Sequence, residues 1–257
     1  MPALLTVENA AFSYGEKIAV EALDFSVMEA DYLCVVGENG SGKSTLLNGI
    51  LGLRQPLNGR IEYSPDLKKT QIGYLPQQNY IQSTFPASSL EVVLSGRLGH
   101  KGPVPFYSRS DRSLAREALA LVGAEELETQ WFGGLSGGQR QRVLLARALS
   151  TAPDGMSLLI LDEPMSGLDP HVRTALYEVI ERLNQEQGIS IIMVTHDVNT
   201  ALHFAKHIIL LASRQIFFGS AEEFEHSELG SEYMRDACAD HCAVCGYSHL
   251  EDGFADA

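Results

Sequence analysis

A glycine-rich segment directly after a short apolar run is the feature of this sequence that most restricts its fold. The apolar run, Asp31–Val36, suits a strand buried on both faces. The segment after it consists of Gly37, Glu38, Asn39, Gly40, Ser41, Gly42, Lys43, Ser44 and Thr45. Between a strand and a helix, such a loop binds phosphate through its backbone N–H groups and the helix dipole. We therefore predict a phosphate-binding loop, in which Lys43 reaches the β- and γ-phosphates of a nucleotide and Ser44 ligates Mg²⁺.

A second apolar run, Ser157–Leu161, ends in two acidic residues. Ligands of open α/β sheets lie at the carboxyl ends of the strands. We therefore expect Asp162 to approach Mg²⁺, and Glu163 to face the γ-phosphate and activate a water molecule. Apolar strands that end in acids are common, so this interpretation depends on the phosphate loop in the same chain.

A third motif, Leu135-Ser136-Gly137-Gly138-Gln139, narrows the choice of family. Together with the two motifs above, it resembles the ATP-binding subunits of ATP-binding cassette (ABC) transporters, over roughly residues 4–220. The resemblance implies that ATP is held between two subunits. It also implies that Ser136, Gly137, Gly138 and Gln139 of one subunit face the γ-phosphate bound by the other. Residues 136–149 suit a helix whose N-terminus offers N–H groups to that anion.

Other positions match the pattern of the same family. The resemblance implies that Tyr14 stacks on adenine. It implies that Gln77 contacts Mg²⁺ and couples the site to the membrane subunit; the adjacent Gln78 leaves a small ambiguity of register, which we resolve in favour of the residue that follows Pro76. Asp169 matches a loop that crosses the dimer interface, and it is also placed to cap the next helix. His196 matches a histidine that binds the γ-phosphate.

The chain departs from the family pattern at two places. Gly134 precedes the Leu135–Gln139 motif, called the signature motif below, at a position where many relatives carry an acid. Ala30-Asp31 replaces a common Pro-Gly turn. Neither change removes a residue of the expected chemistry.

The remaining pattern predicts an α/β protein. Strands that alternate with helices predict a parallel sheet with helices on its faces, and the first 36 residues predict short strands, partly in an antiparallel layer. With the resemblance, this gives a P-loop NTPase (RecA-like) parallel-sheet core, an N-terminal antiparallel β layer and a small α-helical subdomain. We expect an ABC ATPase domain over residues 1–225, with the helical subdomain inserted at about 79–135. Leu114, Ala118 and Leu121 are predicted to share the buried face of one of its helices.

Charge and hydropathy exclude several classes of protein. The formal net charge of −14 argues against nucleic acid as a partner, because such binding needs a basic surface. No apolar run approaches the roughly 18 residues of a membrane span. The N-terminus lacks the basic and apolar regions of a signal peptide. We expect a cytoplasmic protein that docks on the inner face of the cell membrane through a partner.

One segment points to the cargo. Residues 85–112 resemble the membrane-docking region of importers for zinc, manganese and iron chelates. Its apolar residues are expected to form a groove for a helix of the membrane subunit, the core of the subdomain, or some of both: Phe85, Leu90, Val93, Leu94 and Phe106. The resemblance implies a homodimer, an integral membrane permease and, indirectly, an extracytoplasmic metal-binding protein. Zinc or manganese is the expected cargo, while iron-chelate or cobalamin uptake and a soluble ATPase of iron–sulfur assembly stay open.

Residues 226–257 are expected to form an acidic tail. Between residues 221 and 257 there are ten acidic residues against Arg235 alone. The tail also holds five candidate ligands for a tetrahedral Zn²⁺ site, which are Cys238, His241, Cys242, Cys245 and His249. The cysteine spacing also matches radical-SAM iron–sulfur enzymes, and a solvated acidic tail can carry incidental cysteines. Our hypothesis is that the tail senses, buffers or hands on the transported metal.

Overall fold

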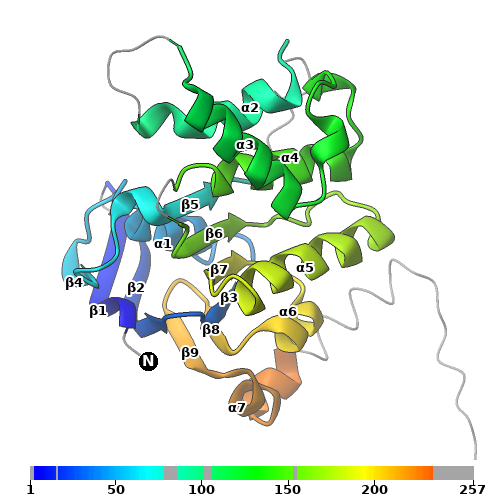
Figure 1. Ribbon diagram of the computed structural model, residues 1–257. Helices are drawn as coiled ribbons and strands as arrows, with labels where there is room; N and C mark the ends of the chain where they lie inside the picture. The colour runs from blue at the N-terminus through cyan, green and yellow to red at the C-terminus, as the bar shows by residue number, and fades with distance from the viewer. Residues whose placement is uncertain (1–2, 16, 78–85, 101–105, 153–154, 234–257) are drawn as a thin grey trace, which may run out of the picture.

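The computed structural model describes residues 3–15, 17–77, 86–100, 106–152 and 155–233. Two β sheets and a group of helices make up the fold (Figure 1). The strands are β1 (Ala3–Tyr14), β2 (Lys17–Met28), β3 (Tyr32–Val36), β4 (Asn58–Tyr63), β5 (Ile72–Leu75), β6 (Leu158–Asp162), β7 (Ser190–Val194), β8 (His207–Leu211) and β9 (Gln215–Ser220). The helices are α1 (Lys43–Ile50), α2 (Ser89–Ser95), α3 (Arg109–Leu121), α4 (Gly137–Leu149), α5 (Pro170–Gln185), α6 (Val198–Phe204) and α7 (Ala221–Glu225). Short 3₁₀ turns are η1 (Lys69–Gln71), η3 (Gly96–His100), η4 (Glu125–Leu127) and η5 (Phe132–Gly134).

The larger sheet has six strands in the order β5-β6-β7-β3-β8-β9. Neighbouring strands run parallel except β9, which is antiparallel to β8. Every residue of β3, β6 and β7 is buried, as expected for strands that are covered on both faces. The parallel-sheet core predicted from the sequence is confirmed.

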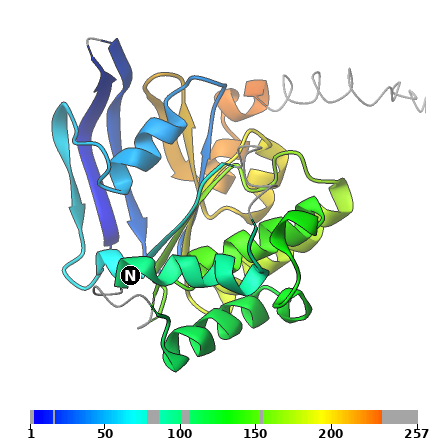
Figure 2. The ribbon, with the colours of Figure 1, turned by 90° about the horizontal axis from the view of Figure 1, so that it is seen from above.

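Alternating side chains of this sheet enter two separate hydrophobic clusters. On β3, Leu33 and Val35 belong to the cluster shared with β1, β2 and α1. Cys34 and Val36 belong to the cluster shared with the helices on the other face. Figure 2 shows the sheet between the antiparallel layer and helices α3, α4 and α5. Since both faces are covered, we expect a ligand to bind at the edge of the sheet where the parallel strands end.

The smaller sheet is antiparallel, with the strand order β2-β1-β4. It confirms the predicted N-terminal layer, although β1 and β2, at 12 residues each, are longer than the expected short strands. Phe12, Val20 and Phe25 pack from this layer towards α1 and the larger sheet. The packing brings the beginning of β2 against the loop that follows β3.

Helices α2, α3 and α4 pack together beside the larger sheet (Figure 1). The buried face of α3 consists of Ala115, Ala118 and Leu119. The predicted face is therefore partly wrong, because Leu121 is 42% exposed and Leu114 is only half-buried. The buried residues are spaced i, i+3 and i+4, so the face that packs is rotated from the predicted one towards Leu119.

The apolar residues of 85–112, expected to form a docking groove, the core of the subdomain or some of both, divide between the core and the surface. Leu90, Val93 and Leu94 are buried in the helical cluster, so they are core residues of this region. Phe106, in contrast, is 80% exposed. Phe85 lies outside the described residues.

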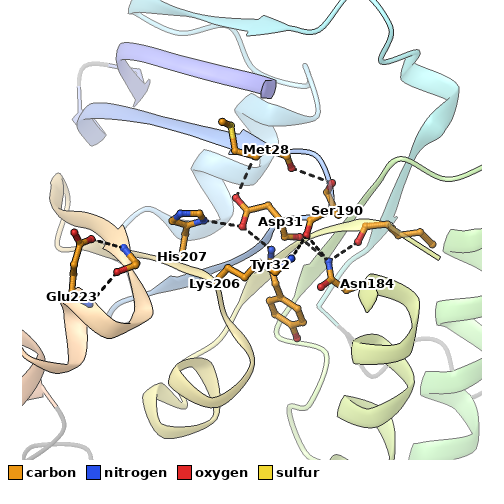
Figure 3. A network of polar contacts seen from close by, with 11 residues as sticks. Met28, Asp31, Tyr32, Asn184, Ser190, Lys206, His207 and Glu223 are labelled. Atoms are coloured by element: carbon orange, nitrogen blue, oxygen red, sulfur yellow. Dashed lines mark hydrogen bonds and ion pairs between the residues drawn. The ribbon is translucent and has the colours of Figure 1, made fainter. Parts of the chain in front are cut away.

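The Ala30-Asp31 departure builds a polar network at the beginning of β3 (Figure 3). The buried Asp31 carboxylate accepts a hydrogen bond from the backbone N–H of Tyr32 at 2.8 Å and lies 2.8 Å from Nδ1 of His207. The amide nitrogen of Asn184 donates to the carbonyl oxygens of Ala30 and Asp31. The network joins β3, β8 and α5 at the end of the sheet opposite the phosphate loop.

None of the helices in the described ranges is long and apolar enough to cross a membrane. The candidate tail ligands lie outside these ranges: Cys238, His241, Cys242, Cys245 and His249.

Candidate nucleotide site

The predicted phosphate loop joins β3 to α1. Gly42 caps α1 with a φ of 102°, in the left-handed region that favours glycine. A Cβ atom at Gly42 would lie 2.6 Å from Cβ of Val20 on β2, and one at Gly37 would collide with the carbonyl oxygen of Leu211. Both positions require glycine because the loop lies directly against β2 and β8.

Ser41 and Lys43 place polar groups within this loop. The buried Ser41 hydroxyl has no hydrogen-bond partner among the residues that the structure describes. The ammonium of Lys43 donates to the carbonyl oxygens of Gly37 and Glu38, both at 2.7 Å. Burial lowers the pKa of Lys43, against the opposing effect of nearby carboxylates. A buried hydroxyl without a partner and a lysine held by its own loop fit the binding of a phosphate anion.

Asp162 ends β6 and faces the beginning of α1. The hydroxyl of Ser44 donates to its Oδ2 at 3.4 Å. Burial raises the pKa of Asp162, and the adjacent charge of Glu163 raises it further, while Ser44 and Lys43 oppose the shift. A carboxylate and a hydroxyl at this spacing are hard oxygen ligands of the kind that Mg²⁺ prefers.

Glu163 follows with an unusual backbone conformation. Its φ of 46° lies in the left-handed region, which residues other than glycine rarely adopt. The conformation is supported by a hydrogen bond from its N–H to the carbonyl oxygen of Val194 at 3.1 Å. Nε2 of Gln77 donates to Oε2 of Glu163 at 2.8 Å. Such strained residues cluster at functional sites, and here the strain accompanies contact between two residues predicted from separate motifs.

Of these side chains, Lys43, Ser44, Gln77 and Glu163 line a cavity of about 460 Å³ between β2 and the phosphate loop. Its lining residues are Lys17, Ile18, Ala19, Asn39, Gly40, Gly42, Lys43, Ser44, Thr45, Gln77, Glu163 and Ser213. The sequence analysis missed four of them, Lys17–Ala19 and Ser213. Their neighbour Tyr14 could have suggested the first three, whereas Ser213 reaches the cavity only through the turn between β8 and β9.

The signature residues lie apart from this cavity. The Ser136 hydroxyl accepts a hydrogen bond from the N–H of Gln139 at 3.3 Å, and the Gln139 side chain accepts one from the N–H of Ser136 at 3.0 Å. This reciprocal cap starts α4 and leaves Ser136 and Gly137 exposed. A Cβ at Gly138 would collide with Val172, so the glycine allows α4 to lie close to α5.

Asp169, His196 and Tyr14 are likewise absent from the cavity lining, as are Asp162, Gly37, Glu38 and Ser41. Asp169 caps α5, as predicted, by accepting a hydrogen bond from the N–H of His171 at 3.0 Å. His196 is exposed beyond the end of β7. Tyr14 ends β1 in register with Lys17, and its side chain lies outside what the structure describes. Gln78 lies outside the described residues.

Comparisons with known proteins agree with this geometry. The sequence model of the family described as "ABC transporter" matches residues 20–166. The zinc uptake system ATP-binding protein ZurA of Listeria innocua is 37% identical, over 93% of this chain and 98% of the relative. The manganese transport system ATP-binding protein MntB of Bacillus subtilis is 37% identical, over 84% of this chain and 86% of the relative.

Solved structures show the same fold. A metal-chelate type ABC transporter in an inward-facing conformation is 33% identical, with a TM-score of 0.81, over 91% of this chain and 90% of that one. A bacterial ABC transporter cassette solved as a dimer is 28% identical, with a TM-score of 0.67, over 84% of this chain and 98% of that one. With the family's sequence model covering more than half of the chain and a relative aligned over nearly all of it, this protein belongs to the ABC transporter family, as one of its ATP-hydrolysing subunits.

Proposed function

We propose that this chain powers the uptake of a metal ion, zinc or manganese, by hydrolysing ATP between two copies of itself. The contact of 2.8 Å between Gln77 and Glu163, at the cavity that also holds Lys43, is the observation that carries the hydrolytic part. The cargo is inferred from the relatives, one named for zinc uptake and one for manganese transport.

We assign the substrate ATP to the cavity of the phosphate loop. Residues 37–45 bind its phosphates, and Tyr14 stacks on its adenine. Ser44, Asp162 and Gln77 would hold Mg²⁺, which when bound neutralises charge on the phosphate oxygens. Nε2 of Gln77 is engaged by Glu163, so its Oε1 is the atom left for the metal.

In the proposed reaction, Glu163 takes a proton from the water that attacks the γ-phosphate. The amide of Gln77 orients the Glu163 carboxylate through their hydrogen bond. The ammonium of Lys43 turns from its loop carbonyls to the phosphate oxygens and stabilises their charge, and His196 contacts the γ-phosphate.

The site described in one chain is proposed to be completed by the second copy. Ser136, Gly137, Gly138 and Gln139 of that copy, with Asp169 nearby, would cap the γ-phosphate. The support is the exposed N-terminus of α4, whose helix dipole suits an anion, and the dimeric form of a related cassette. Loss of the γ-phosphate removes the bridge between the copies, so the dimer reopens.

The expected assembly follows from the proposed transport. A membrane permease would hold the dimer at the cytoplasmic face of the cell membrane, and an extracytoplasmic metal-binding protein would supply the cargo to it. In this proposal residues 1–225 form the ATPase domain, and the subdomain at 79–135 docks on the permease. The exposed Phe106 is the support for that docking face.

Phosphate release from Mg²⁺-ATP by the purified protein tests the catalytic part. Wild type should turn over, and Glu163→Gln should lose about 100-fold or more of the rate, the lower limit for a general base. Glu178→Gln on the exposed face of α5 makes the same charge change and should leave the rate unchanged. Equal rates in all three proteins would refute the role of Glu163.

Uptake measurements in cells that lack the gene test the cargo. Radioactive zinc or manganese accumulation should fall and should return with the wild-type gene but not with Glu163→Gln. Unchanged uptake of both metals together with lost uptake of an iron chelate would overturn the cargo assignment.

We also propose that the tail binds Zn²⁺ through residues among Cys238, His241, Cys242, Cys245 and His249, which rests on their spacing alone. The full chain, purified reduced and without oxygen, should carry one zinc that is lost when the three cysteines become serine. Equal zinc in both proteins would refute this proposal, as would iron with sulfide.

A further inference from the structure

Lys17 stands out among the cavity residues because its charge is not used inside the protein. Its side chain lines the cavity and is exposed. Within the described part of the chain, no hydrogen bond or ion pair engages its ammonium group. By contrast, the ammonium of Lys43 is already held by the carbonyl oxygens of Gly37 and Glu38. A lysine without a protein partner in a cavity suited to a polyanion is available to the ligand.

The position of Lys17 indicates which part of a nucleotide it would meet. Lys17 begins β2, in the smaller sheet, whereas the phosphate loop extends from the larger sheet. Strand β2 touches the loop at Ala19, whose carbonyl oxygen would lie 2.9 Å from a Cβ at Gly42. Lys17 is two residues back along the strand, or about 6.6 Å at 3.3 Å per residue. A lysine side chain spans a similar length, so the ammonium can reach the anion in front of Gly42.

The other charged groups of the cavity limit the choice of phosphate. Lys43 and the N–H groups of the loop face the β- and γ-phosphates in the proposed function. Glu163 lines the same cavity, and the Asp162 carboxylate is beside Ser44, so both suit the region of Mg²⁺ and the attacking water. Ile18, a large apolar residue that is 46% exposed, lies next to Lys17 and suits the nucleoside. Lys17 is therefore on the nucleoside side of the phosphate chain.

We propose that Lys17 is a nucleotide-binding residue whose ammonium contacts the α-phosphate of the bound nucleotide. The proposal rests on the assignment of ATP to this cavity. It makes β2 a second phosphate-binding element beside the loop. Since the α-phosphate is common to ATP and ADP, Lys17 strengthens the binding of both equally and does not distinguish substrate from product.

Isothermal titration of the full-length protein with ATP, ADP and adenosine tests the proposal. Lys17→Met keeps the length of the side chain without its charge, and Lys17→Arg keeps the charge. Lys68→Met, at an exposed residue outside the cavity, is the matched control for net charge. Lys17→Met should weaken the binding of ATP and of ADP by the same factor, about five- to tenfold; a tenfold loss of affinity corresponds to about 1.4 kcal/mol. The ATP and ADP affinities of Lys17→Arg and Lys68→Met should stay within about twofold of wild type. The ATP affinity of Lys17→Met should depend less on salt than that of wild type, because one charge is missing. Adenosine binding should not change.

Different failures have different meanings. If wild type itself does not bind ATP, the proposed function is wrong. If wild type binds ATP and Lys17→Met binds it equally well, the inference about Lys17 is wrong while the proposed function stands. A loss confined to ATP would place Lys17 at the γ-phosphate, and an equal loss for adenosine would place it at the nucleoside; either result overturns the assignment to the α-phosphate.

Discussion

Replacing Arg97 by methionine removes the central polar contact of the helical region while keeping most of the side-chain volume. Arg97 lies in η3, and its Nε is 3.1 Å from Oδ1 of Asp111 at the start of α3. Its Nη1 donates to the carbonyl oxygen of Ser150, just beyond α4, at 2.9 Å. The side chains of Arg97 and Asp111 are only 6% and 14% exposed. One guanidinium thus joins α3 to α4, the helix that carries the signature motif.

The expected cost follows from this burial. Breaking a buried ion pair by removing one partner costs roughly 3–5 kcal/mol. Asp111 keeps two hydrogen bonds from Ser108 after the change, so its carboxylate is still partly stabilised. The expected loss of unfolding free energy is therefore at the lower end of that range, about 3 kcal/mol. At roughly 2–4 °C per kcal/mol for a chain of about this size, the melting temperature should fall by about 6–12 °C.

Calorimetry of Arg97→Met beside Arg116→Met is the appropriate assay. The second variant breaks the ion pair of Arg116 with Glu128, whose side chains are 56% and 28% exposed. An exposed pair contributes about 0–1 kcal/mol, so the control should shift by no more than roughly 4 °C. Equal shifts in the two variants would refute the reasoning, because burial would then have no influence on the contribution of the pair.

Three further predictions concern the loop, the base of the sheet and acid stability. Without nucleotide, Gly42→Ala should lower the melting temperature by the equivalent of about 1–3 kcal/mol. Alanine disfavours a φ of 102°, and its Cβ would lie 2.6 Å from that of Val20. An unchanged melting temperature would contradict the loop geometry. Asp31→Ala should lower the free energy of unfolding by about 1–3 kcal/mol, because it leaves the N–H of Tyr32 and the ring of His207 without their buried acceptor. A neutral effect in thermal unfolding would show that the network in Figure 3 adds no stability. The hydroxyl and N–H of Ser108, with Arg97, lower the pKa of Asp111 from 3.8 to about 2, so its contribution is complete above a pH of about 4 and is lost as the pH falls towards 2. The stability difference between wild type and Asp111→Asn should shrink over that window, and a constant difference would contradict the assignment.

Local chemistry made the framework of the site predictable. A loop that must wrap a phosphate requires glycine where the backbone is left-handed or crowded, and Gly37 and Gly42 occupy such positions. Apolar strands deliver Asp162 and the loop to the same edge, because parallel strands end together. The contact between Gln77 and Glu163 joins segments 86 residues apart, and only the family pattern related them in advance.

The remaining features depend on packing that no single segment encodes. Ser213 lines the cavity because the turn between β8 and β9 meets the phosphate loop there, and nothing in its own neighbourhood indicates it, whereas for Lys17 the neighbouring Tyr14 was the one available signal. Periodicity identified α3 as a helix and placed Ala118 on its buried face, but the other two residues of that face are Ala115 and Leu119, not Leu114 and Leu121. At Gly134 a Cβ would make a close contact, 3.1 Å, with the exposed indole of Trp131, which a glycine avoids.

Light scattering of Glu163→Gln with and without Mg²⁺-ATP tests the central claim most directly. If two copies enclose ATP and hydrolysis reopens them, the variant should be monomeric alone, dimeric with ATP and monomeric with ADP. Adding Ser136→Arg to the same chain should abolish the dimer, because the exposed N-terminus of α4 would then be blocked. The account would be contradicted if the variant bound ATP at this site and stayed monomeric. It would also be contradicted if the dimer formed equally well with Ser136→Arg.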